Sequence, residues 1–255
     1  MTALLQAFDL KKSFGGVAAV DGVSIAVRPG ALAGLIGPNG AGKSTLFGLL
    51  AGALPPDAGR IELKGQDVTG WPDYRIARLG LTRTFQLARE LDRLTVLENL
   101  LLAVPDQPGE QLGAVFLSPR RVRAAQAASV AQAREILSMV GLAKKEDSLA
   151  KELSGGQKKL LELGRALMTG ADVILLDEIG AGVAPALLVE LCDLIARLNR
   201  EHGKTFLLVE HNMSVIRRLC ERVTVMANGK ILIEGSFDEV RRDPRVIEAY
   251  LGVAA

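Results

Sequence analysis

The sequence contains few of the residues that form metal centres or disulfide frameworks. Two cysteines and two histidines occur among its 255 residues. Cys192 and Cys220 do not have a metal-ligand spacing, and they fit a reducing compartment better than a disulfide-bonded scaffold. With His202 and His211 as the two histidines, a histidine-rich metal site is also excluded.

Long apolar runs and a large net charge are absent as well. No stretch of about 18 apolar residues is present, so we expect no membrane-spanning helix. The segment Met1–Lys12 lacks a cationic head and does not resemble a secretory signal. The formal net charge is +2, which excludes a strong attraction of the whole chain to nucleic acid or anionic lipid. Apolar residues, in contrast, form 49% of the chain and predict a sizeable core.

Strand and helix patterns alternate through the first and last parts of the chain. Alternating residues at Val23–Val27 and a short run at Arg60–Leu63, after a turn at Asp57–Gly59, predict two strands. The apolar strands are expected at Ala31–Ile36, Val173–Leu176, Thr205–Val209 and Val223–Met226. The helices between these strands are expected to include Ser44–Leu54 and one with an apolar face from Leu187 to Leu198. This alternation predicts a parallel sheet with helices on both faces.

The middle of the chain, roughly 87–153, has a helical pattern. The pattern becomes helical from about Tyr74 onward. Three prolines and two glycines predict a loop over Pro105–Pro119. A single helix rich in Ala, Arg and Gln is then expected over Arg120–Leu142. We interpret this stretch as a helical subdomain inserted into an α/β domain.

A glycine-rich loop follows the first apolar strand and satisfies the pattern GxxxxGK[ST]. Its residues are Gly37, Pro38, Asn39, Gly40, Ala41, Gly42, Lys43, Ser44 and Thr45. About 0.01 such matches are expected by chance in this composition, so a nucleotide phosphate site is strongly favoured. The backbone N–H groups and the helix start would hold the phosphates. Lys43 would reach the β- and γ-phosphates, Ser44 would bind Mg²⁺, and Thr45 would contact the α-phosphate.

The apolar strand Val173–Leu176 ends in two acids, Asp177 and Glu178. Asp177 at this position can hold Mg²⁺ through water. Glu178 can then act as a general base on an attacking water. An ordinary strand end with solvated acids is the alternative, but the phosphate loop upstream makes the catalytic interpretation much stronger.

A second pair of glycines opens a helix after the middle region. Ser154 is a favourable N-cap, and Gly155, Gly156 and Gln157 follow it before the helix Lys158–Met168. Such a helix start can also bind phosphate. One nucleotide is not readily wrapped by both helix starts of one molecule. Two chains arranged head to tail, each completing the other's site, would resolve this.

The order of these motifs resembles that of the ATP-binding cassette (ABC) family, the ATPase subunits of ABC transporters. The phosphate loop, Gln86, the LSGGQ motif at 153–157, the acidic strand end and His211 follow one another as in that family. The resemblance implies an α/β fold, namely a P-loop NTPase ABC-type nucleotide-binding domain with an antiparallel β subdomain and an inserted helical subdomain. It implies a single domain, with 1–86 and 154–255 as the core and 87–153 as the helical subdomain.

The resemblance also implies ATP and Mg²⁺ as ligands and assigns roles to three more residues. Phe14 matches the aromatic that stacks on adenine, although a core aromatic beside a turn is the alternative. Gln86 matches the glutamine that senses Mg²⁺ and the γ-phosphate and links to the membrane subunit, although Gln is usually a solvated loop residue. His211 matches the switch histidine on the γ-phosphate, whereas His202 is interpreted as an ordinary helix-end residue.

The chain departs from the family pattern after the acidic pair. Ile179 stands where the family usually has Pro, and Ala184 stands where the next loop usually carries Asp or Asn. That loop normally couples the two sites of the dimer. Because Glu178, Ser154 and His211 are intact, we expect hydrolysis, but coupling between the sites is in question.

Several segments look like the ATPases of importers for branched-chain or other hydrophobic amino acids. They are Thr82–Gln86, Leu94–Leu100, the basic middle helix and the tail Pro244–Gly252. The implied partners are a second ABC ATPase chain, identical or paralogous, two transmembrane permease subunits and, indirectly, a solute-binding protein. The implied location is the cytoplasmic face of the inner membrane, as a peripheral protein that binds no nucleic acid.

Other classes of protein share parts of this pattern. ATPases of urea importers and of lipopolysaccharide exporters have much of it. A soluble ABC ATPase acting on nucleic acid or ribosomes would normally carry long coiled-coil arms or two cassettes. A nucleotide kinase or GTPase would lack LSGGQ.

Apolar residues are unusually dense between Gln86 and Ala103. They are Leu87, Leu91, Leu94, Val96, Leu97, Leu100, Leu101 and Leu102. We expect some of them to line an exposed groove for a short helix of the membrane subunit, because exposed apolar patches mark partner sites. Complete burial of all of them in the subdomain core is the alternative.

Overall fold

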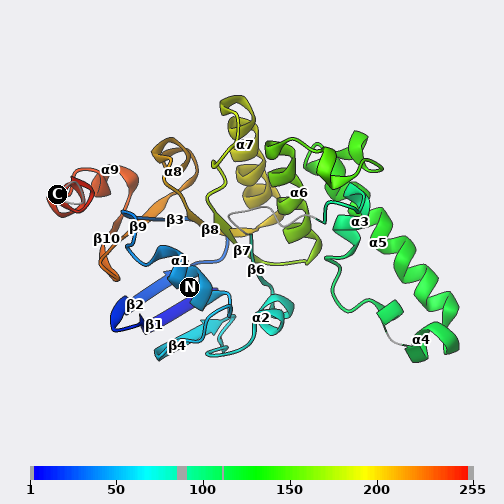
Figure 1. Cartoon of the computed structure of the whole chain (residues 1–255), viewed down its shortest axis with the longest axis horizontal. Coiled ribbons are helices and arrows are strands. Elements are labelled where there is room, and N and C mark those ends of the chain that lie inside the picture. The colour runs from blue at the N-terminus through cyan, green and yellow to red at the C-terminus, as the bar shows by residue number, and fades with distance from the viewer. Residues whose placement is uncertain (1–2, 85–90, 111, 252–255) are drawn as a thin grey trace.

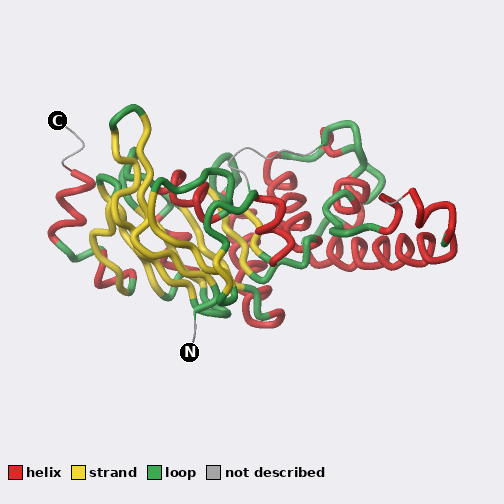
Figure 2. Tube along the Cα trace, turned by 90° about the horizontal axis from the view of Figure 1, so that it is seen from below, coloured by secondary structure: helices red, strands yellow, loops and turns green. Residues whose placement is uncertain are grey.

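Two β-sheets lie at one end of the molecule, and helices extend from the other end (Figures 1 and 2). The structure is a computed structural model, and it describes residues 3–84, 91–110 and 112–251. Among the helices of these ranges, none is both long and apolar enough to cross a membrane.

The smaller sheet is antiparallel, with the strand order β2-β1-β4-β5. Its strands are β1 (Leu5–Phe14), β2 (Val17–Val27), β4 (Ala58–Leu63) and β5 (Gln66–Asp67). Gly15 and Gly16 join β1 to β2 with φ of 51° and 86°, the left-handed geometry that a tight hairpin requires. The expected turn at Asp57–Gly59 is partly wrong, because β4 already starts at Ala58 and pairs with Lys11.

The larger sheet has the order β10-β9-β3-β8-β7-β6. Its strands are β3 (Leu32–Ile36), β6 (Leu81–Arg83), β7 (Val173–Asp177), β8 (Thr205–Val209), β9 (Arg222–Ala227) and β10 (Lys230–Gly235). All neighbours pair in parallel except β9 and β10, which are antiparallel. The parallel sheet expected from the apolar runs is confirmed. The short edge strand β6 was not expected, because its three residues lie within a helical pattern.

The two faces of the larger sheet carry different parts of the core. Alternate residues of β7 and β8 point to opposite faces, as strand geometry dictates. Ile174 and Phe206 join the apolar cluster formed with α6 (Gly155–Met168) and α7 (Pro185–His202). Leu175 joins the other cluster, with α1 (Lys43–Leu50) and the antiparallel sheet.

The remaining helices of this part of the molecule are short. They are α1 (Lys43–Leu50), α2 (Asp73–Leu79), α8 (Met213–Leu219), α9 (Phe237–Val240) and α10 (Pro244–Leu251). The helix expected over Ser44–Leu54 is therefore shorter than expected. His202 ends α7 and Gly203 follows with φ 62°, so the helix-end interpretation of His202 is confirmed.

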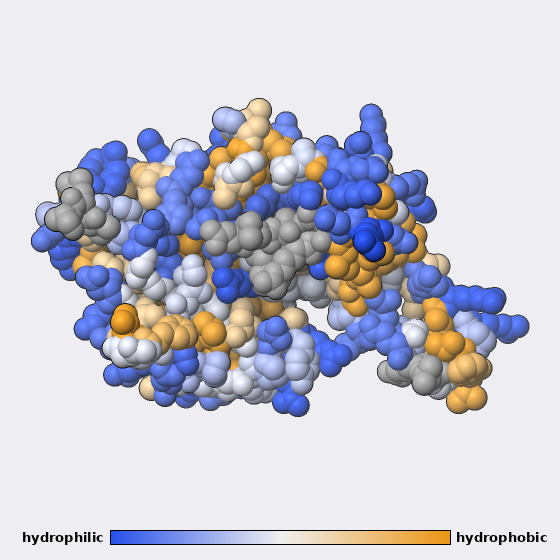
Figure 3. Space-filling view, in the orientation of Figure 1, coloured by the Kyte–Doolittle hydropathy of each residue, from blue (hydrophilic) through white to orange (hydrophobic). Residues whose placement is uncertain are grey.

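The middle of the chain forms a helical arm, with its longest helix extending away from the strands in Figure 2. Its elements are α3 (Val96–Leu101), η1 (Pro108–Glu110), α4 (Leu112–Leu117), α5 (Pro119–Met139), η2 (Ala143–Lys145) and η3 (Ala150–Glu152). The expected loop over Pro105–Pro119 is wrong in its second half, because the proline-free run 112–117 forms a helix. Phe116 and Leu117 on this helix are 79% and 85% exposed, and apolar side chains cover the arm tip in Figure 3. The division at 86/87 and 153/154 stays a prediction.

Candidate functional site

The phosphate loop connects β3 to α1, as its sequence predicts. Gly40 and Gly42 have φ of 79° and 100°, which other residues rarely adopt. A Cβ at Gly42 would collide with the carbonyl oxygen of Ala19, and one at Gly37 with that of Met226. Glycine at 37 and 42 thus lets the loop pass close to neighbouring backbone and keeps its N–H groups near the start of α1.

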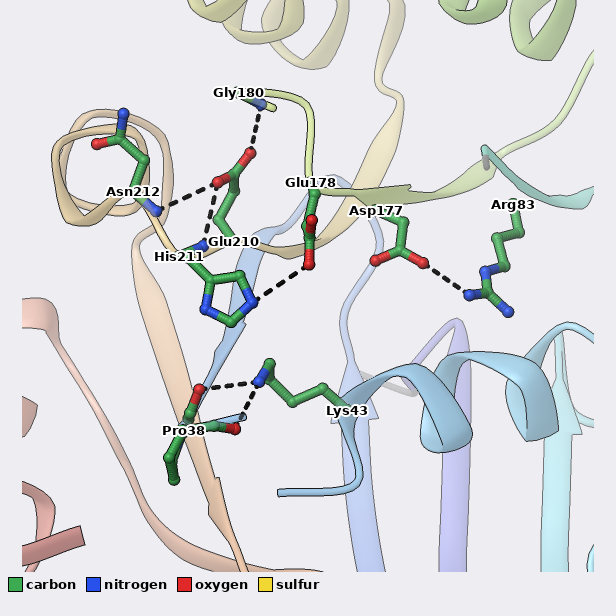
Figure 4. Close-up of polar contacts among 10 residues, drawn as sticks. Pro38, Lys43, Arg83, Asp177, Glu178, Gly180, Glu210, His211 and Asn212 are labelled. Atoms are coloured by element: carbon green, nitrogen blue, oxygen red, sulfur yellow. Dashed lines mark hydrogen bonds and ion pairs between the residues drawn. The ribbon is translucent and has the colours of Figure 1, made fainter. Parts of the chain in front are cut away.

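Lys43 lies inside the curve of this loop. Its Nζ donates hydrogen bonds to the carbonyl oxygens of Gly37, at 2.8 Å, and Pro38, at 2.9 Å (Figure 4). Burial lowers the pKa of Lys43, and the carboxylates of Glu178 and Asp177 oppose that shift. The two acids are therefore close enough to act on the ammonium electrostatically. A cation held in this way is suited to bind phosphate oxygens.

Asp177 is the last residue of β7 and is almost fully buried, with 2% of its surface exposed. Its Oδ2 accepts a hydrogen bond of 2.6 Å from Nη2 of Arg83, at the end of the neighbouring strand β6. The Arg83 guanidinium also lies 5.8 Å from the centre of the Phe47 ring. The end of β6, which leads toward Gln86, is thus tied to the acidic strand end.

Glu178 has a left-handed backbone conformation, with φ 51°. Its N–H donates to the carbonyl oxygen of Val209 at 2.9 Å, so the turn after β7 stays bound to the end of β8. The Glu178 Oε1 lies 3.2 Å from Nε2 of His211, the second residue after β8 (Figure 4). The structure therefore brings together two residues that are 33 positions apart in the sequence.

Glu210 is a residue that the sequence interpretation missed. It lies between β8 and His211, and 3% of its surface is exposed. Its carboxylate accepts hydrogen bonds from the backbone N–H groups of Gly180, His211 and Asn212 at 2.7, 3.1 and 3.3 Å. The available signal was a carboxylate directly after the apolar run Phe206–Val209, since buried acids are rare without partners.

The LSGGQ segment lies at the start of α6. Ser154 and Gln157 form a reciprocal cap. The Ser154 N–H donates to Oε1 of Gln157 at 3.0 Å, and the Gln157 N–H donates to Oγ of Ser154 at 3.3 Å. The N-cap prediction is confirmed. A Cβ at Gly156 would collide with the Leu187 side chain. α6 packs on the opposite face of the larger sheet from α1, so the two glycine-rich helix starts belong to different layers.

The remaining residues with a predicted role at the site are Phe14, Ser44, Thr45 and Gln86. Phe14 ends β1 and is 48% exposed, which contradicts the alternative of a core aromatic. The Lys12 Nζ lies 5.7 Å from its ring centre. Its stacking on adenine stays a prediction. Ser44 is exposed in the first turn of α1 and Thr45 is half-buried there. Gln86 lies outside the described residues.

One mostly parallel sheet carries a phosphate loop before α1, an acidic pair at the end of β7 and a histidine after β8. Together these features define a P-loop ATPase. The protein-family comparison matches residues 20–181 to the description "ABC transporter", and residues 230–255 to "Branched-chain amino acid ATP-binding cassette transporter". The chain belongs to the ABC transporter family, among the ATP-binding proteins of branched-chain amino acid transporters.

Individual relatives agree along almost the whole chain. The branched-chain amino acid transport ATP-binding protein LivG of Salmonella typhimurium is 39% identical over 251 residues, which cover 98% of both chains. The corresponding protein BraF of Pseudomonas aeruginosa is 36% identical, with the same coverage. The crystal structure of a nucleotide-free ATP-binding cassette from an ABC transporter has a TM-score of 0.85 and 38% identity, and covers 97% of this chain and 98% of its own. The expected ABC-type fold is thus confirmed.

Proposed function

We propose that this ATPase powers the uptake of branched-chain or other hydrophobic amino acids through membrane permease subunits. The observation that carries the proposal is the match of the tail 230–255 to branched-chain amino acid ATP-binding cassette transporters, beside the match of 20–181 to ABC transporters in general. Relatives that are 36–39% identical carry the same description over 98% of the chain. The transported solute does not touch this chain in the proposed mechanism.

The chemistry of hydrolysis is proposed from the contacts around Glu178. The phosphate loop and Lys43 bind the β- and γ-phosphates of ATP, and the carboxylate of Glu178 takes a proton from the attacking water. His211, 3.2 Å from Glu178, contacts the γ-phosphate and holds the base and the phosphate in one geometry. Positioning and electrostatic stabilisation supply most of the rate, since phosphoryl transfer requires little covalent chemistry from the protein.

Mg²⁺ is proposed to bind between the start of α1 and the end of β7. Ser44, Asp177 and Gln86 would supply oxygen donors, which are the ligands that Mg²⁺ prefers, and few protein ligands would suffice because Mg²⁺ keeps several waters. Arg83 contacts Oδ2 of Asp177, which would leave Oδ1 to accept from a water held by the ion. Bound there, the ion would neutralise charge on the β- and γ-phosphates.

The proposed active form is a head-to-tail dimer. Because α1 and α6 lie on opposite faces of the sheet, the helix start at Ser154–Gln157 is available to the nucleotide of a second cassette. The second chain is identical or paralogous, and each chain completes the other's site. Hydrolysis then removes the γ-phosphate that holds the dimer closed.

A permease surface is proposed beside the end of β6. Two surface hollows, of about 230 and 220 Å³, share Thr82 and Arg83. Of the eight apolar residues between Gln86 and Ala103, Leu91 and Leu102 are 46% and 57% exposed. The others differ: Val96 and Leu100 are buried, Leu94, Leu97 and Leu101 are half-buried, and Leu87 lies outside the described residues. Complete burial is therefore wrong, and an apolar edge is available for a short helix of the permease.

Two measurements test this function. In a strain lacking the gene, uptake of radiolabelled leucine and of urea is compared with and without the wild-type chain, and the chain carrying Glu178→Gln serves as a control. Restored leucine uptake by the wild type alone supports the proposal. Restored urea uptake, or association with an exporter, would redirect it to the other transporter classes. Co-purification with permeases and membrane fractions tests the peripheral location on the cytoplasmic face.

A further inference from the structure

The buried carboxylate of Glu210 joins two segments of the active site that the chain order keeps apart. One oxygen, Oε1, accepts from the Gly180 N–H, two residues after Glu178. The other oxygen, Oε2, accepts from the N–H groups of His211 and Asn212. Figure 4 shows this carboxylate between the loop after β7 and the start of α8.

We propose that Glu210 is a positioning residue, which sets the distance between Glu178 and His211 and transmits movements of the loop 179–184 to His211. The inference rests on the roles proposed above for Glu178 and His211. In this proposal Glu210 does not touch the nucleotide. It acts through hydrogen bonds to the backbone near Glu178 and at His211.

The hydrogen-bond geometry makes a carboxylate necessary at this position. Three N–H donors converge on Glu210, and a carboxylate is the side chain that has acceptors on both oxygens and no hydrogen to donate. Hydrogen bonds to a charged acceptor at a buried site are stronger than neutral ones. A glutamine would have one acceptor oxygen, and its amide group would face an N–H on the other side. Glu210→Gln therefore breaks one half of the bridge while the side-chain volume is kept.

The bridge also bears on the departures of this chain from the family pattern. The loop that normally couples the two sites of the dimer has Ala184 in place of a polar residue. Gly180, which Glu210 holds, is the second residue of that same loop region. A displacement of the loop at the dimer interface would thus reach His211 within one chain, through a single side chain. In this chain, Glu210 supplies a connection that does not require a polar side chain at position 184.

The experiment compares Glu210→Gln with Glu221→Gln, an exposed glutamate beyond α8 that serves as the matched control. ATP turnover and the dissociation constant of a non-hydrolysable ATP analogue are measured at a temperature at which both variants are fully folded. We expect kcat to fall about 10- to 100-fold in Glu210→Gln, the scale of one lost charge-assisted hydrogen bond. The dissociation constant should change far less than kcat, because the phosphate loop and Lys43, which supply most contacts to the nucleotide, are untouched. A kcat within about twofold of the control would overturn the proposal.

A double-mutant comparison separates positioning from general stability. In a His211→Ala background, Glu210→Gln should lower kcat far less than in the wild type, because its effect passes through His211. Full additivity would assign Glu210 a structural role only and would refute the inference. If Glu210→Gln does not fold, Glu210→Asp keeps the negative charge but shortens the side chain by one methylene, so that it cannot reach all three donors, and the same comparison applies. The turnover of Glu178→Gln is measured in parallel. If it equals that of the wild type, the proposed base is wrong, and this result is distinguished from a failure of the Glu210 inference alone.

Discussion

Replacing Glu178 by glutamine removes a proton acceptor and leaves the local structure almost unchanged. Glutamine has nearly the same volume, it keeps the backbone N–H that donates to Val209, and its amide can still form a hydrogen bond with His211. The cost of a left-handed residue is also the same for both side chains. The expected effect is therefore confined to the chemical step. Loss of a general base typically costs 10²–10⁴ in rate, and a hundredfold loss corresponds to about 2.7 kcal/mol.

The assay is phosphate release by the purified chain under saturating ATP. We expect at least a hundredfold lower kcat, with ATP affinity unchanged within about twofold. Light scattering should detect a dimer that persists with ATP, because the nucleotide is held and not hydrolysed. Glu201→Gln, at an exposed position near the end of α7, is the matched control and should behave as the wild type. Normal turnover in Glu178→Gln would show that another group activates the water.

The other predictions concern the loop, the permease surface and the thiols. Lys43→Ala should weaken ATP binding at least tenfold in a nucleotide titration, because it removes the buried cation, and unchanged affinity would place this lysine outside the site. Gly42→Ala should lower the free energy of unfolding by more than about 1 kcal/mol in urea, since it adds a Cβ at φ 100°, and a neutral effect would contradict the loop geometry. Leu102→Glu, at a 57% exposed position, should reduce transport and leave hydrolysis by the free chain intact, whereas normal transport would argue against a permease contact there. Burial raises the pKa of Cys192 to about 11 and of Cys220 to about 12, so both thiols should resist alkylation at pH 8 until urea unfolds the chain. Because unfolded thiols ionise first, stability should fall as the pH rises from 9 toward 11, and rapid native alkylation would contradict this burial.

Features written in a short stretch of sequence were predictable. The phosphate loop, the Ser154 cap and the apolar strands each depend on neighbours in the chain, and the structure confirms the cap and the strands. The strand β6 was not predictable, since three residues have no period of their own and their conformation depends on pairing with β7.

The contacts that the sequence did not predict at the site join residues far apart in the chain. The contact of Arg83 with Asp177 joins residues 94 positions apart, and no local pattern encodes it. Glu210 was visible as an acid after an apolar strand, but its donors come in part from Gly180, thirty residues earlier. Packing of the tertiary structure decides such pairs, so the sequence predicts which residues carry the chemistry better than which residues hold them in place.

The left-handed backbone of Glu178 lowers the stability of the fold at a position where the side chain is proposed to be needed for hydrolysis. A non-glycine residue in this conformation costs about 1–2 kcal/mol. Glu178→Gly would remove that cost, and the greater freedom of glycine in the unfolded chain would offset about 0.5–1 kcal/mol of the gain. The same change would remove the carboxylate on which hydrolysis is proposed to depend. Laboratory evolution that selects this protein for heat resistance alone would therefore tend to enrich inactive chains, and a screen for robust variants has to score ATP turnover together with folding.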